Sequence, residues 1–140
     1  MLVKEFALKY HVTSDTVRYY EKEGLLQPQR LENGYRFYDE QCEKSIKYIM
    51  VLKQMGFSLQ EIQQLLQLGN SPITEACNRM STTLFENKVM HIKQKIDFFT
   101  SALEVLQVVL ELTSEGRYSE NQSRIDNLVD HMYQKLVDVK

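Results

Sequence analysis

The sequence predicts a mainly α-helical chain, with a small N-terminal domain, then one long helix and a short C-terminal helix. Three observations support this fold class. Two short amphipathic helical patterns fall within the first 26 residues. The pair Asn33-Gly34, a strong signal for a β-hairpin, follows them. From Phe85 to Leu110, apolar residues recur at alternating spacings of four and three, which is typical of a coiled coil.

Composition fits one small domain with an elongated element. The chain has 140 residues, of which 43% are hydrophobic, and a formal net charge of −2. This charge does not indicate nucleic acid, so DNA binding would depend on where individual cations lie. No apolar stretch is long enough to cross a membrane and no signal peptide is recognisable, so we expect a cytoplasmic protein without a membrane partner. The expected divisions are residues 1–70, 71–116 and 117–140.

The first two helices are expected to meet at a tight corner. The first is predicted from an apolar face made by Val3, Phe6, Ala7 and Tyr10. Thr13 can cap the second helix, and Gly24 can end it. That second helix carries Arg18 and Tyr19, whose side chains can bind guanine or phosphate. This is the pattern of a helix-turn-helix, although a plain helical hairpin in a bundle gives the same signal.

A small wing is expected next. Pro28 directs the chain into an extended form, and residues 29–32 and 35–38 flank a two-residue turn at Asn33-Gly34. Arg30 and Arg36 lie on the two predicted strands, beside the second helix. A basic wing next to a recognition helix makes a winged helix-turn-helix, which favours DNA binding over a plain hairpin.

Four motifs resemble the MerR (mercury-resistance regulator) family of bacterial transcription regulators. They are residues 3–7, 16–26, 33–38 and 55–62, and they cover about the first half of the chain; the second half is similar only in architecture. The resemblance implies DNA contacts from the second helix and from the wing. Asp15 stands where some members carry a base-contacting lysine, so no sequence preference is carried over there. The predicted DNA surface comprises Ser14, Thr16, Arg18, Tyr19, Arg30, Asn33, Tyr35 and Arg36.

Two further helices complete the predicted N-terminal domain. Asp39 is expected to cap a third helix that runs to about Met55. Residues 58–61 form a capping box that opens a fourth, which Gly69 would end. The segment 70–72 then marks the boundary to the long helix.

The long helix is predicted to join two copies of the chain in an antiparallel coiled coil. A helix of this length cannot bury its apolar seam against a small domain, so a second copy is the simplest partner. The alternative is pairing with the final amphipathic helix, which is too short to cover the seam. The seam consists of Phe85, Val89, Ile92, Ile96, Phe99, Leu103, Leu106 and Leu110.

The sequence indicates a regulator and not an enzyme. Its three histidines lie far apart, and no phosphate-binding loop, nucleophile motif or zinc motif occurs, so no cofactor is expected. The family resemblance implies a homodimer that binds double-stranded promoter DNA. In response to an effector it would bend and untwist that DNA, so that RNA polymerase with its sigma factor can start. The competing class is a coiled-coil protein-interaction module without DNA binding.

Two cysteines are the candidates for sensing an effector. Cys77 lies near where metal sensors of the family place a metal-binding cysteine, but the loop near Gly116 supplies no further thiol. A structural role for Cys77 therefore ranks first, a redox or electrophile sensor second, and a metal site third. Cys42 is interpreted as a small core residue, with the same thiol chemistry as its alternative.

Overall fold

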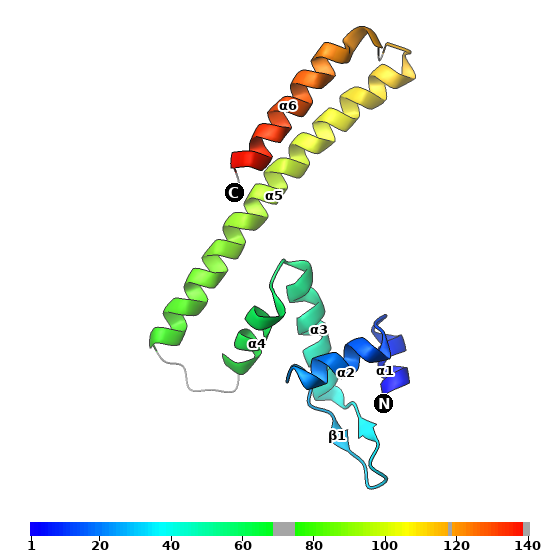
Figure 1. Cartoon of the computed structure of the whole chain (residues 1–140), viewed down its shortest axis with the longest axis vertical. Coiled ribbons are helices and arrows are strands. Elements are labelled where there is room, and N and C mark those ends of the chain that lie inside the picture. The colour runs from blue at the N-terminus through cyan, green and yellow to red at the C-terminus, as the bar shows by residue number, and fades with distance from the viewer. Residues whose placement is uncertain (69–74, 118, 139–140) are drawn as a thin grey trace. The chain divides into compact units, whose positions relative to one another are not determined.

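The computed structural model describes residues 1–68, 75–117 and 119–138, and it separates into two compact units, Met1–Leu84 and Phe85–Lys140. We call these the head and the stalk. The side chains of residues 76 and 77 are also outside the description. In chain order the elements are α1 (Val3–Lys9), α2 (Ser14–Lys22), β1 (Gln29–Arg30), β2 (Arg36–Phe37), α3 (Glu40–Gln54), α4 (Leu59–Leu68), α5 (Glu75–Ser114), η1 (Ser119–Asn121) and α6 (Gln122–Asp138) (Figure 1). The mainly α fold class is confirmed, while the expected boundary near residue 70 lies outside the described residues.

The head is built on one apolar core to which all of its helices contribute. α1 and α2 pack together and meet at His11, which adopts a left-handed conformation with φ of 55°. The corner is closed by hydrogen bonds from the His11 amide to the Leu8 carbonyl (3.3 Å) and from the Val12 amide to the Ala7 carbonyl (3.0 Å). The predicted helix-turn-helix is therefore present. The core residues buried almost completely are Phe6, Val17, Leu26, Tyr38, Cys42, Ile46, Ile49 and Ile62.

The predicted N-terminal caps of α2, α3 and α4 are confirmed, whereas Gly69, expected to end the fourth helix, lies outside the described residues. The Thr13 hydroxyl accepts a bond from the Thr16 amide at 3.0 Å, and the Asp39 carboxylate accepts one from the Cys42 amide at 3.0 Å. At the start of α4, Ser58 and Glu61 exchange the two bonds of a capping box. The sequence predicts these caps because each one involves residues only three positions apart.

The wing is an antiparallel hairpin, but its turn differs from the one expected. β1 and β2 pair with Arg30 opposite Arg36, and each strand has two residues. The Leu31 amide donates to the Tyr35 carbonyl (2.9 Å), so residues 32–34 form a three-residue loop. Gly34 takes the left-handed position of that loop, with φ of 83°. The predicted two-residue turn is therefore wrong, because the Asn-Gly pair also suits a three-residue hairpin loop.

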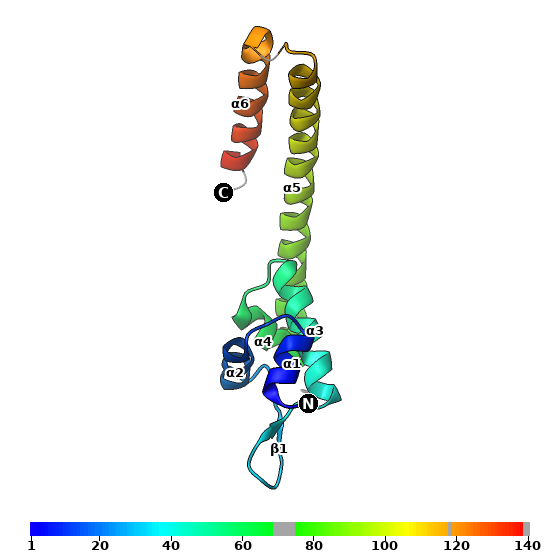
Figure 2. The ribbon, with the colours of Figure 1, turned by 90° about the vertical axis from the view of Figure 1, so that its right-hand side faces the viewer.

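The stalk is a pair of helices in which α6 runs back alongside the C-terminal half of α5 (Figures 1 and 2). The Lys135 ammonium donates to the Ser101 hydroxyl at 2.7 Å and lies 3.2 Å from the Asp97 carboxylate. Leu112 on α5 and Ile125 on α6 are both buried, at 5% exposure each.

Apart from Phe99, which lines a cavity together with α6 residues, the predicted seam lies on a different part of the α5 surface from the part that contacts α6. Seven of its eight members remain exposed, at 46% to 67%, and Ile92 is half-buried. The intramolecular alternative, in which the final helix covers the seam, is therefore wrong. In the part of the chain that the structure describes, no helix is both long and apolar enough to cross a membrane.

Candidate nucleic-acid interface

The recognition helix α2 has one buried face and one exposed face. Val17 and Tyr20 point into the core, and Tyr20 is only 4% exposed. Tyr19 is 47% exposed, and Arg18 is exposed beside it. One Arg18 Nη atom lies 3.1 Å from the Asp15 carboxylate, one turn earlier. The sequence contains two adjacent phenols, and the fold leaves only Tyr19 open to a ligand.

Two predicted hydroxyl contacts lie at the start of α2. Ser14 and Thr16 are both half-buried. The Thr16 hydroxyl is 2.8 Å from the Thr13 hydroxyl, which is itself the helix cap. Thr16 thus supports the capping of α2, and any phosphate contact that it makes has to be compatible with that bond.

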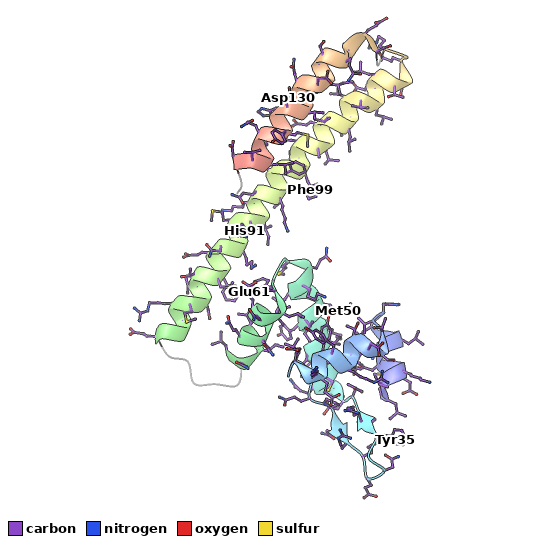
Figure 3. All side chains as sticks on the ribbon, viewed as in Figure 1. Tyr35, Met50, Glu61, His91, Phe99 and Asp130 are labelled. Carbon is purple, nitrogen blue, oxygen red and sulfur yellow. The ribbon has the colours of Figure 1, made fainter. Side chains whose placement is uncertain are left out.

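The wing presents an exposed rim of polar side chains. Arg30 donates from Nη1 to the Gly34 carbonyl at 3.1 Å, and the Asn33 side-chain oxygen accepts from the Tyr35 amide at 3.1 Å. Both side chains therefore shape the loop while they remain exposed. Tyr35 projects from the wing (Figure 3).

An ion pair ties the wing to the recognition helix. Arg36 on β2 lies 2.6 Å through Nε from the Glu21 carboxylate on α2, and both side chains are partly buried. The bond to Glu21 raises the pKa of the Arg36 guanidinium. A guanidinium has five N–H donors, so the use of Nε still leaves Nη donors for a phosphate. Sequence reasoning missed Glu21, because its partner is fifteen residues away and no local pattern links them.

A second network holds α1 against α3. The Glu43 carboxylate on α3 accepts bonds from the Lys9 ammonium and from the Tyr10 hydroxyl, the latter at 2.8 Å. The bonds from Lys9 and Tyr10 lower the pKa of the Glu43 carboxyl. This network was also missed, since it joins residues 34 positions apart.

The two cysteines differ in what the structure says of them. Cys42 is 1% exposed, and burial raises the pKa of its thiol. A buried thiol with a raised pKa is a poor nucleophile, so the core interpretation fits Cys42 best. The Cys77 side chain lies outside the description. Among the described residues, no group of three or more His, Cys, Asp or Glu side chains could hold a metal ion.

The stalk contains a cavity of about 640 Å³ near the C-terminal end of α6. Its apolar part comes from Phe98, Phe99 and Leu136, and its polar rim includes His91 and Lys95. Figure 3 shows His91 and Phe99 along α5. Phe99 also belongs to the exposed seam, so this cavity borders the surface that we predict to join two copies.

Comparisons with known proteins agree with this geometry. The family model "MerR HTH family regulatory protein" matches residues 1–68, and the model "MerR, DNA binding" matches residues 44–109. The chain is 33% identical over 140 residues to the HTH-type transcriptional regulator CueR of Salmonella typhi, covering 97% of this chain and 99% of that one. It is 32% identical over 106 residues to the regulator ZntR of Escherichia coli K12, covering 75% and 74%.

A solved structure shares the fold. It is that of HiNmlR, described as a MerR family regulator lacking the sensor domain, bound to promoter DNA. The TM-score is 0.68 at 24% sequence identity, and the match covers 89% of this chain and 94% of that one. The overall fold is thus shared with a solved structure over most of both chains. The chain belongs to the MerR family of helix-turn-helix regulatory proteins.

Proposed function

We propose that this transcriptional regulator acts in the cytoplasm as a homodimer that binds double-stranded promoter DNA through α2 and the wing. The observation that carries the proposal is the Glu21–Arg36 ion pair, which joins the two elements into one surface. Exposed cations and phenols then face outward from both elements, as phosphate and base contacts require. The contact residues proposed are Ser14, Thr16, Arg18, Tyr19, Arg30, Asn33, Tyr35 and Arg36.

The exposed seam on α5 supports the dimer. Its side chains would leave a continuous apolar stripe in water if the chain stayed monomeric, and such stripes mark interfaces. A second copy in antiparallel register buries the stripe on both helices. A two-fold dimer also presents two recognition helices to two half-sites of an operator.

Regulation is proposed to act on the shape of the promoter. The dimer bends and untwists DNA whose promoter elements are spaced too far apart, and RNA polymerase with its sigma factor can then start transcription. Bending a site costs on the order of 1–6 kcal/mol. An effector that couples to the dimer by about 1–3 kcal/mol can shift that balance appreciably.

The stalk cavity favours a small organic effector over thiol chemistry at Cys42. Its volume of about 640 Å³ falls in the range of small-molecule sites, and its lining combines aromatic rings with a polar rim. Because Phe99 lines the cavity and also belongs to the seam, a ligand there touches the proposed dimer interface. A redox or electrophile sensor at Cys77 is the alternative.

Fluorescence anisotropy on the DNA upstream of the protein's own gene, across a salt series, tests the proposal. Arg18→Ala should cost about 1–3 kcal/mol on the cognate operator, as expected for a lost base contact. Arg36→Ala should weaken binding to all duplexes more evenly. Binding unchanged by both substitutions together would show that α2 and the wing are not the DNA-binding surface. Failure of the parent protein to bind any duplex would favour the interaction-module class, in which DNA is not the partner.

A further inference from the structure

Asp15 is out of place on a surface built to meet phosphates. It lies in the first turn of α2, and its side chain is 96% exposed. Its one described side-chain partner is the Arg18 guanidinium, at 3.1 Å. A carboxylate close to a phosphate backbone is repelled, so its presence there calls for a compensating donor on the DNA.

The major groove offers such donors only on certain bases. Residues near the N-terminus of a recognition helix contact base edges, which is where Asp15 lies. A carboxylate only accepts hydrogen bonds, and the exposed donors in that groove are the amino groups of cytosine and adenine. Guanine and thymine present acceptors there and repel a carboxylate. Adenine also places its N7 acceptor beside its amino group, so cytosine is the better match.

Asp15 and Arg18 are well placed to act together. Residues three apart on a helix share a face, and the ion pair shows that the two side chains reach each other. The Asp15 carboxylate only accepts hydrogen bonds, and the Arg18 guanidinium only donates them. Together they suit a cytosine edge and a guanine edge in neighbouring base pairs.

We propose that Asp15 determines operator specificity by accepting a hydrogen bond from a cytosine amino group while Arg18 donates to a neighbouring guanine. This inference rests on the proposed function, because it requires that α2 enters the major groove. The negative charge of Asp15 also stabilises α2 through the dipole at the start of the helix. That role alone predicts a change in stability with no change in sequence preference.

Selection from a randomised duplex library, followed by sequencing, tests the inference, because such a library contains every candidate half-site. The parent should select cytosine at one position of each half-site, with a preference of about tenfold over other bases. Asp15→Asn should move that preference to adenine, because an amide bonds the adenine N6 and N7 atoms together. Asp15→Ala should lose the preference and gain none.

Glu120→Gln is the matched control, since Glu120 is an exposed carboxylate in the η1 turn of the stalk. It should select the same sequences as the parent. Thermal melting of each variant checks folding separately. Unchanged selection by both Asp15→Asn and Asp15→Ala would overturn the role of Asp15 and leave DNA binding intact. Failure of the parent itself to enrich any sequence would overturn the proposed function.

Discussion

Neighbouring residues of identical type have opposite environments on α2. Tyr19 is exposed, whereas Tyr20 lies in the core with the Lys53 ammonium 3.4 Å from its hydroxyl. The helical period separates them by about 100°, but the sequence alone does not say which of the two faces inward. The packing of α1 against α2 decides it.

Removing each hydroxyl in turn should therefore give different results. Tyr19→Phe should weaken operator binding by about 0.5–1.5 kcal/mol, the usual worth of one hydrogen bond, without changing the melting temperature. Tyr20→Phe should leave operator affinity unchanged. Anisotropy titration and thermal melting of both variants measure the two effects. A loss of affinity in Tyr20→Phe equal to that in Tyr19→Phe would contradict the assignment of the faces.

His11 occupies a backbone conformation that favours glycine. Its φ of 55° closes the corner between α1 and α2. Left-handed geometry costs an L-residue roughly 1–2 kcal/mol, and glycine avoids most of that cost but loses more chain entropy on folding. His11→Gly should therefore raise the free energy of unfolding by about 0.5–1 kcal/mol, as measured by urea denaturation. His11→Ala is the control, and it should give no such gain.

At the scale of elements, we expect the orientation of the wing to depend on the Glu21–Arg36 ion pair. Glu21→Gln removes a negative charge from a DNA-binding surface, which by electrostatics alone should strengthen binding. Because the change also weakens the bond that holds Arg36, we expect operator affinity to fall instead. Glu32→Gln, at an exposed position in the wing loop, removes the same charge and should bind as well as the parent or better. Equal gains in both variants would show that the ion pair does not position the wing.

The network that joins α1 to α3 should respond to acid. The pKa of the Glu43 carboxyl is lowered from its ordinary value of 4.5, mainly by the bond from Lys9. Its stabilising effect is therefore complete above that ordinary value and disappears as the pH falls through the lower folded value. Glu43→Gln should unfold more easily than the parent at pH 7, and the difference should shrink below pH 4.5. Asp39, whose pKa is also lowered, is present in both proteins and cancels in the comparison.

The sequence predicted correctly those interactions that join residues close together in the chain. The caps at Thr13, Asp39 and Ser58 involve neighbours three residues apart, and their predictions are confirmed. Apolar periods and cap residues likewise predicted the helices α1 to α6. The wing turn was missed by one residue, because Asn-Gly is compatible with more than one hairpin loop.

Long-range pairs were beyond such reasoning. Glu21 with Arg36, and Glu43 with Lys9, have no local signature, because only the packed core brings them together. The DNA contacts remain predictions, although the exposure of Arg18 and Tyr19 is compatible with them.

At the scale of the whole molecule, assembly is proposed to depend on the exposed seam of α5. Ile96→Asp would place a charge in the middle of the seam, where burial without a partner is costly. Light scattering should then report a monomer, and operator affinity should fall because one head alone makes half of the contacts.

Asn87→Asp is the matched control for this prediction. Asn87 is exposed on α5 away from the seam, so a new charge there should leave the protein dimeric. If Ile96→Asp also stays fully dimeric at low micromolar concentration, another surface joins the two copies.

The position of α6 has a consequence for how such regulators diversify. Because α6 covers one side of α5 and leaves most of the seam exposed on another, the residues proposed to join two copies are largely separate from those that hold the final helix. Related chains in one cell can therefore acquire new C-terminal helices while they keep recognising their own kind. A chimaera that keeps this seam but carries a foreign final helix should still exchange subunits with the parent.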